Sequence, residues 1–146
     1  MTDASYAYFD TSTWLKSYIQ EGGSEEARDL VRQYQGFSSA VLLVECFSAL
    51  SRKWISREID GRKLNRLVKA IQTDVRSLEM IQVNAPVLDK AQEIVLQTLA
   101  RPLDAVHIAS ALIFQEMARV KVLFITSDHR QSDVAVHVGL SSKFVS

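Results

Sequence analysis

Four acidic residues of this sequence occupy positions from which they could hold a metal ion. Asp10 ends an aromatic-rich stretch, and Asp128 closely follows a run of apolar residues. Glu45 lies inside a strongly apolar stretch, and Asp104 lies in the first turn of the most apolar helix that the sequence predicts. A carboxylate in apolar surroundings is costly unless a positive group pairs with it, so Glu45 and Asp104 are each expected to have a partner.

Each acid taken alone has an ordinary explanation. Asp10 could cap a helix, Asp104 could favour the positive end of its own helix, Asp128 could belong to a turn, and Glu45 could pair with a buried base. If the four meet, however, they repel one another unless a cation neutralises them. Carboxylate ligands without a Cys–His cluster favour Mg²⁺ or Mn²⁺ over zinc.

The periodicity of apolar residues predicts the elements that position these acids. The predicted strands are 5–10, 37–40, 80–83, 122–126 and 143–145. The predicted helices are 14–19, 24–34, 43–54, 64–78, 86–99, 103–118 and 131–138. Strands that alternate with helices indicate an α/β fold with a parallel sheet, a three-layer sandwich with helices on both faces. Ligands of such sheets bind at the carboxyl ends of the strands, where Asp10 and Asp128 lie.

Several residues are predicted to mark helix boundaries or to pack in the core. Ser24 is expected to cap the second helix, and Gly36 is expected to end it. Leu99 continues the apolar face of the fifth helix, and Trp14 and Trp54 lie on apolar stripes, which favours core packing over base stacking.

The composition is that of a folded globular protein, with 47% hydrophobic and 23% charged residues, and it excludes a disordered or fibrous chain. Residues 1–146 contain no repeat or linker and are expected to form a single domain. No apolar run reaches the length of a membrane span, so no membrane partner is expected. The start, 1–5, lacks the features of a secretory signal, and the single Cys46 cannot form an internal disulfide, which together predict a cytoplasmic protein.

The net charge is zero, but the charges are unevenly distributed. Residues 51–76 carry eight bases and three acids, a local charge of +5, so the rest of the chain sums to −5. The eight bases are Arg52, Lys53, Arg57, Arg62, Lys63, Arg66, Lys69 and Arg76. Such a segment is typical of solvated helix faces, and also of a surface that contacts nucleic acid or a protein partner. Arg62, Lys63 and Arg66 are the candidate contacts.

The stretches around the four acids resemble a known family. They read YFDTS (8–12), LVE (43–45), RPLDAVHIASA (101–111) and FITSD (124–128). These are similar to the four acidic motifs of PIN domains, most of all those of the VapC-type toxins of bacterial and archaeal toxin–antitoxin pairs. The resemblance covers essentially the whole chain, with the motifs in the same order and at similar spacing.

The resemblance implies a parallel α/β sandwich with Mg²⁺- or Mn²⁺-dependent endoribonuclease activity on single-stranded RNA. It implies that the catalytic, metal-binding acids are Asp10, Glu45, Asp104 and Asp128, with Ser12 and Thr126 as supporting hydroxyls and Asp133 as a further acid that some members use. It also implies a cognate antitoxin as partner. Because the family often forms homodimers, a second copy of the chain is a further expected partner.

The implied chemistry suits these residue types. A phosphodiester needs its charge neutralised and a water deprotonated, and divalent ions held by carboxylates can do both, so that no histidine is needed as general base. Asp128 is expected to complete the site, since a strand end is well fixed, while Asp133 is expected to begin a helix and to support or cap it. His107 is expected to be a buried, hydrogen-bonded residue, and Cys46 a small buried hydrophobe.

Two other functions remain compatible with the motifs, namely a nuclease of housekeeping RNA processing and a non-catalytic binding module on the same fold. The presence of all four acids counts against the binding module, and the short chain favours the toxin. A phosphate-transfer domain of the haloacid-dehalogenase type would need a second Asp where Ser12 stands, and a receiver domain would need an Asp after the strand 80–83, where Asn84 and Ala85 follow.

Overall fold

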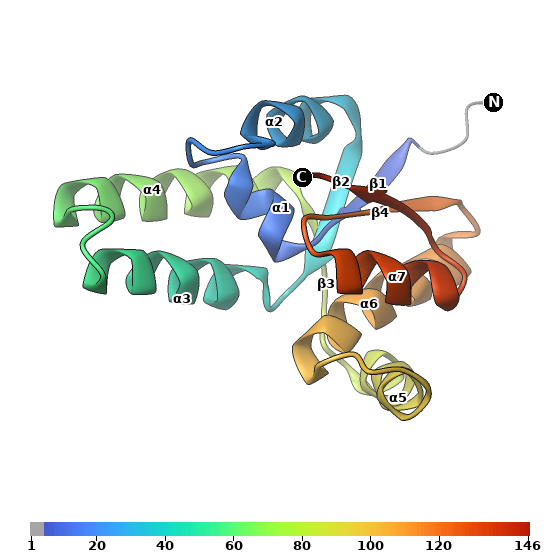
Figure 1. The fold of residues 1–146 in the computed structure, drawn as a ribbon. Helices are drawn as coiled ribbons and strands as arrows, with labels where there is room; N and C mark the ends of the chain where they lie inside the picture. Colours follow the sequence, from blue (N-terminus) through green and yellow to red (C-terminus); the bar gives the residue numbers. More distant parts are fainter. Residues whose placement is uncertain (1–4) are drawn as a thin grey trace.

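A computed structural model describes residues 5–146, which contain a five-stranded parallel sheet in the order β3-β2-β1-β4-β5 (Figure 1). The strands are β1 (Tyr6–Phe9), β2 (Gln35–Ser39), β3 (Glu79–Ile81), β4 (Val122–Thr126) and β5 (Ser141–Phe144). The predicted parallel α/β fold is therefore confirmed. Residues 1–4, which carry most of the stretch used to predict the lack of a secretory signal, lie outside the described residues.

Helices cover both faces of the sheet. They are α1 (Thr11–Lys16), α2 (Ser24–Gln33), α3 (Leu42–Ile55), α4 (Gly61–Asp74), α5 (Ala85–Gln97), α6 (Pro102–Ala118) and α7 (His129–His137), with a 3-10 turn, η1 (Val75–Ser77). Apolar side chains of α1 to α4 pack in one cluster with one face of the sheet, and those of α5 to α7 pack in a second cluster with the other face. The predicted three-layer sandwich is confirmed.

The two clusters meet the sheet through alternate residues of its central strands. Phe9 and Ile125 belong to the cluster of α1 to α4, whereas Tyr8 and Phe124 belong to the cluster of α5 to α7. The register pairs Tyr8 with Phe124 and Phe9 with Ile125, so the paired side chains of β1 and β4 pack against the same layer of helices. This register also brings the ends of β1 and β4 side by side.

Some predicted boundaries are wrong. Ser24 is not the cap of α2, because Gly23 takes that position at φ 85° and the Ser24 hydroxyl instead accepts from the amide of Glu21. Gly36 lies inside β2, where a Cβ would come within 2.7 Å of Leu78 and 2.9 Å of Phe9. Gly36 is thus needed for close packing rather than for ending a helix.

Two predicted core residues lie at the surface. Leu99 follows the end of α5 and is fully exposed at 101%, and Trp54 is 47% exposed near the end of α3. Trp14 is buried as predicted. Periodicity overestimates burial here because it shows neither where a helix ends nor what packs beside that end.

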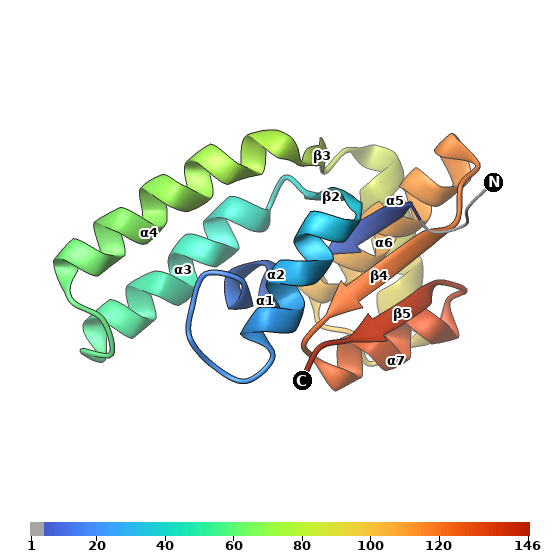
Figure 2. The same cartoon turned by 90° about the horizontal axis from the view of Figure 1, so that it is seen from above.

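α3 and α4 form a hairpin that extends away from the sheet (Figure 2). The hairpin buries Leu50 of α3 and Leu67 and Ile71 of α4 in the cluster of α1 to α4. Asp60 begins α4 by accepting a hydrogen bond from the amide of Lys63 at 2.8 Å. Among residues 5–146, no helix is long and apolar enough to span a bilayer.

Candidate active site

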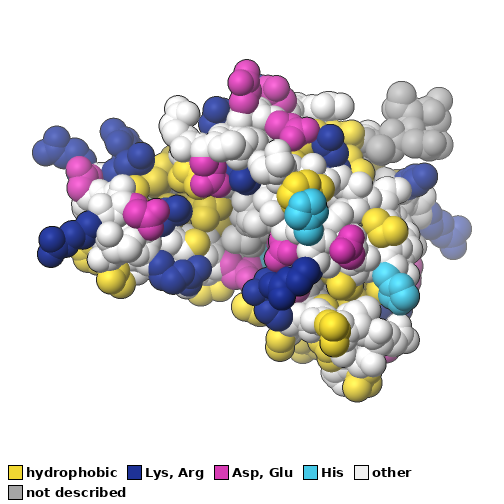
Figure 3. All heavy atoms as spheres, viewed as in Figure 1, with side chains coloured by type: hydrophobic (Ala, Val, Ile, Leu, Met, Phe, Trp, Pro, Cys, Tyr) yellow, Lys and Arg dark blue, Asp and Glu magenta, His cyan; other side chains and the backbone are white. Residues whose placement is uncertain are grey.

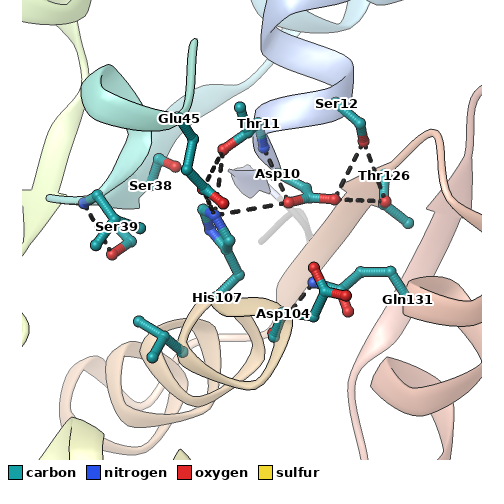
Figure 4. A network of polar contacts seen from close by, with 12 residues as sticks. Asp10, Thr11, Ser12, Ser38, Ser39, Glu45, Asp104, His107, Thr126 and Gln131 are labelled. Atoms are coloured by element: carbon teal, nitrogen blue, oxygen red, sulfur yellow. Dashed lines mark hydrogen bonds and ion pairs between the residues drawn. The ribbon is translucent and has the colours of Figure 1, made fainter. Parts of the chain in front are cut away.

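Asp10 is anchored at the carboxyl end of the central strands. It directly follows β1, and its amide donates to the carbonyl of Ile125 in β4 at 3.0 Å. Its Oδ1 accepts from the amide of Thr11 at 2.9 Å and so caps α1. Its Oδ2 accepts from the hydroxyls of Ser12 at 3.1 Å and Thr126 at 2.7 Å (Figure 4). The structure thus brings together three residues that the sequence singled out.

The Asp10 carboxylate is only 6% exposed, and burial raises its pKa above the ordinary value. The positive charge of His107 and the two hydroxyl hydrogen bonds oppose this rise, while the charge of Asp104 adds to it. A carboxylate whose ionised form is disfavoured in this way gains stability from any cation placed beside it.

Glu45 reaches the same region from the first turn of α3. The Nε2–H of His107, in α6, donates to Glu45 Oε1 at 2.5 Å, and the Thr11 hydroxyl donates to the same oxygen at 2.7 Å. The same Nε2 lies 3.8 Å from Oδ1 of Asp10. His107 therefore lies between two of the predicted acids, as Figure 4 shows.

Glu45 and His107 shift each other's pKa in opposite directions. Burial alone would raise the pKa of Glu45, but hydrogen bonds from His107 and Thr11 and the charge of His107 bring it below its ordinary value. Burial alone would lower the pKa of His107, but the Glu45 hydrogen bond and the nearby carboxylates raise it. His107 is 1% exposed and also hydrogen-bonds the Tyr8 hydroxyl through Nδ1, which confirms the predicted buried, satisfied histidine.

Asp104 and Asp128 are joined by one arginine. Arg101 donates from Nε to Asp104 Oδ2 at 2.7 Å and from Nη2 to Asp128 Oδ2 at 3.2 Å. The other oxygen of Asp128 caps α7 by accepting from the amide of Arg130 at 2.9 Å. The amide of Asp128 donates to the Thr126 hydroxyl at 3.1 Å, so this hydroxyl links Asp128 to Asp10.

The four acids thus lie at one edge of the sheet, in two pairs that are each bridged by one side chain. His107 serves Asp10 and Glu45, and Arg101 serves Asp104 and Asp128. Oxygen ligands of this kind fit Mg²⁺ or Mn²⁺, because hard cations prefer carboxylates. Within the described part of the chain, however, no three Asp, Glu, His or Cys side chains are arranged to hold one ion. The donor types fit a divalent cation, while here the chain supplies the positive partners itself.

Asp133 occupies a different place from the one predicted. α7 begins at His129, so Asp133 lies in its second turn, and the residue that caps this helix is Asp128. Asp133 is exposed and lines a hollow of about 320 Å³ together with Arg101 and Asp104. The prediction that Asp133 begins the helix is wrong, because the helix starts two residues earlier than its apolar pattern suggests.

The basic residues lie mainly on the α3–α4 hairpin. Arg52 and Lys53 are on α3, the helix that also carries Glu45. Arg62, Lys63 and Arg66 are on α4, where Arg62 and Arg66 are exposed and Lys63 is half-buried. Figure 3 shows several Lys and Arg side chains over the free end of the hairpin, with a few acidic side chains among them.

Three residues of the site were not assigned a role from the sequence. Thr11 contacts Glu45, Arg101 bridges two acids, and the side-chain amide of Gln131 donates to the main-chain carbonyl of Asp104 at 3.1 Å. A signal existed for Arg101, since it precedes Asp104 by three residues, a spacing typical of ion pairs on helices. Contacts between distant segments, such as those of Thr11 and Gln131, leave no such local pattern.

Comparisons with known proteins agree with this architecture. The sequence model of the PIN domain matches residues 7–137. The toxin–antitoxin complex from Klebsiella pneumoniae contains a similar chain, with a TM-score of 0.61, 14% identity, and 86% of this chain and 88% of that chain covered. For the crystal structure of FitAcB from Neisseria gonorrhoeae, the TM-score is 0.69 at 14% identity, with 93% and 95% covered. No curated protein sequence matches this chain significantly.

Proposed function

This chain belongs to the PIN domain family, and from that premise we propose that it is a metal-dependent endoribonuclease that cleaves single-stranded RNA as the toxin of a toxin–antitoxin pair. One observation carries the proposal. Acids from four separate segments lie at the carboxyl edge of the sheet, in two pairs that His107 and Arg101 bridge. Such an edge is where parallel α/β sheets bind their ligands.

Asp10, Glu45, Asp104 and Asp128 are the residues that would hold Mg²⁺ or Mn²⁺. Such an ion would neutralise charge on the scissile phosphodiester and lower the pKa of the attacking water. The chain's own residues orient the acids. Ser12 and Thr126 donate to one oxygen of Asp10, and the Thr11 amide donates to the other, so this carboxylate has a single orientation.

His107 acts on the acids rather than on the substrate. Its Nε2 donates to Glu45 Oε1 and so keeps this carboxylate turned toward Asp10. Its Nδ1 is engaged by the Tyr8 hydroxyl, which fixes the ring. His107 is therefore a positioning residue in the proposed site.

The toxin assignment is supported by the similarity to a chain of the toxin–antitoxin complex from Klebsiella pneumoniae. We accordingly propose a cognate antitoxin and a second copy of the chain as protein partners, and the cytoplasm as the place where they meet. Arg62, Lys63 and Arg66 are the proposed contacts to RNA or to the antitoxin, because they carry positive charge at the free end of the hairpin.

Cleavage of a labelled single-stranded RNA tests the enzymatic part. The wild-type chain should cut the RNA with Mg²⁺ or Mn²⁺ and lose this activity in a chelator. Asp10→Asn should be inactive, whereas Asp89→Asn, which changes an exposed acid of α5, should cleave as the wild type does. Cleavage that persists in Asp10→Asn or in the chelator would contradict the mechanism.

Expression in bacteria tests the toxin part. Wild-type expression should arrest growth, and Asp10→Asn should not. Co-expression of the reading frame next to the gene should relieve the arrest and yield a complex that co-purifies with this chain. RNA cleavage in vitro without growth arrest would contradict the toxin assignment and favour an RNA-processing nuclease.

A further inference from the structure

Arg101 is the only side chain that the structure places in contact with both Asp104 and Asp128 among the described residues. It lies just before Pro102, the first residue of α6, and donates through two different nitrogens, Nε and Nη2. A guanidinium that bonds two carboxylates in this way neutralises the charge that would otherwise keep them apart.

For Asp128, the oxygen that Arg101 contacts is the one that remains for a ligand. Oδ1 of Asp128 accepts from the amides of Arg130 and Gln131 at 2.9 and 3.5 Å, so it is committed to capping α7. Oδ2 of Asp128 and Oδ2 of Asp104 instead face the guanidinium. A cation that binds Asp128 therefore needs the oxygen that Arg101 contacts, and at Asp104 it meets the same guanidinium.

The side chain of Arg101 is also free to move away from Asp104 and Asp128. This side chain is 60% exposed, whereas those of Asp104 and Asp128 are partly buried. Ion pairs of exposed side chains contribute little to stability, so breaking these two contacts costs little. A guanidinium and a divalent ion on the same oxygens would repel each other strongly, so the two positive groups exclude one another.

We propose that Arg101 competes with the divalent metal ion for Asp104 and Asp128, so that its side chain lowers the metal affinity of the site and leaves these oxygens when metal binds. This inference rests on the proposed function, since it takes these acids to be metal ligands. Arg101 thus prevents repulsion of the acids in the metal-free protein and sets the metal concentration at which the site fills.

Calorimetric titration of the metal-free proteins with Mn²⁺ tests the competition. Arg101→Met removes the guanidinium and keeps much of the aliphatic stem, and it should bind Mn²⁺ about threefold to tenfold more tightly than the wild type. Arg130→Met is the matched control. It removes an exposed arginine next to Asp128 whose side chain forms no hydrogen bond or ion pair within residues 5–146, and its affinity should stay within about twofold of the wild type.

Nuclear magnetic resonance of arginine side chains gives a second readout that does not depend on activity. The Nε–H signal that is missing from Arg101→Met belongs to Arg101, and in the wild type it should shift as Mg²⁺ saturates the protein. Unfolding temperatures of the metal-free variants check that both are folded.

The outcomes separate the two proposals. If the wild type binds Mn²⁺ and Arg101→Met binds it equally tightly or more weakly, the proposed competition is overturned. The nuclease proposal then still stands. Equal tightening in Arg130→Met would also overturn the competition, because overall charge would then be the cause. If the Nε–H signal of Arg101 is unchanged at Mg²⁺ saturation, the proposed competition is likewise overturned. If no variant binds Mn²⁺, the metal-dependent function itself is contradicted, and the competition with it.

Discussion

The hydroxyl of Thr126 donates to Oδ2 of Asp10 at 2.7 Å although the two residues are 116 positions apart. The contact exists because β1 and β4 are adjacent parallel strands in a register that pairs Phe9 with Ile125, so the next residues of both strands lie side by side. The same hydroxyl accepts from the amide of Asp128 at 3.1 Å. Thr126 therefore connects two acids at the sheet edge, and its hydrogen bond favours the ionised form of Asp10.

Asp10→Asn and Asp104→Asn should differ in their effect on the stability of the metal-free protein. Repulsion alone would predict that both changes stabilise, but Asp104 has Arg101 as a partner. Asp10 is buried with a raised pKa, so its ionised form costs folding free energy, about 1.4 kcal/mol for each pKa unit. Urea unfolding at pH 7 should show Asp10→Asn to be more stable than the wild type, and Asp104→Asn to lie within about 1 kcal/mol of it.

The direction of the pKa shift of Asp10 also determines how the effect of Asp10→Asn on stability depends on pH. A carboxyl whose folded pKa is raised destabilises the protein as pH rises through the unfolded value of about 4. The gain in unfolding free energy from Asp10→Asn should accordingly be full at neutral pH. It should vanish at a pH where the Asp10 carboxyl of the wild type is protonated in both the folded and the unfolded state. An advantage that persists unchanged at pH 3 would show that the charge of Asp10 is not its cause.

The Glu45–His107 pair should stabilise the metal-free protein over a defined pH range. The raised pKa of His107 gives stability that is full below the unfolded value of about 6.5 and is lost as pH rises through the folded value. The lowered pKa of Glu45 gives stability that is present above about 4.3 and is lost as pH falls. Wild type and Glu45→Gln should therefore differ most in unfolding free energy near pH 5.5 and less at pH 9.

Glu93→Gln, which changes an exposed acid of α5, is the control for this comparison and should show no such pH dependence. Proton titration followed by nuclear magnetic resonance should place the pKa of His107 above its ordinary value in the wild type, and lower in Glu45→Gln. An unchanged His107 titration in Glu45→Gln would refute the pairing.

Asp128→Asn should lower the rate of metal-dependent RNA cleavage at least about tenfold, and Asp133→Asn should keep it within about twofold. Asn is chosen because Asp128 also caps α7, and Asn preserves a cap as well as Asp does. A loss of rate then reflects the missing charge rather than a frayed helix. Single-turnover rates at saturating Mn²⁺ measure this difference, and a larger loss in Asp133→Asn would assign the site to Asp133.

Replacing Arg62, Lys63 and Arg66 together by Ala should weaken RNA binding and reduce its dependence on salt, with Mn²⁺ affinity unchanged. Each phosphate contact that is lost lowers the slope of log affinity against log salt by about 0.7 for single strands. The control replaces Lys90, Arg119 and Lys121, three bases outside the basic segment. If both triple variants lose RNA affinity equally, the hairpin has no special role in RNA binding.

Local patterns in the sequence determined much of this protein. The apolar run 122–126 forms β4 with the predicted bounds, and the alternation of strands and helices predicted the three-layer parallel fold. Asp10 and Asp128 could be placed at the sheet edge because a residue that follows a parallel strand emerges at the carboxyl end. These features depend on neighbours along the chain, which the sequence displays directly.

The partners of the acids depended on the tertiary structure. Thr11 and Glu45 are 34 residues apart, His107 and Glu45 are 62 apart, and Arg101 and Asp128 are 27 apart. Such contacts follow from strand order, from register and from where each helix ends, and periodicity contains none of these. The exposure of Leu99 has the same origin, because only the packed fold shows that nothing covers this side chain. The sequence alone therefore singled out four acids that the fold brings to one edge of the sheet, whereas their pairing with His107 and Arg101 arises from long-range packing.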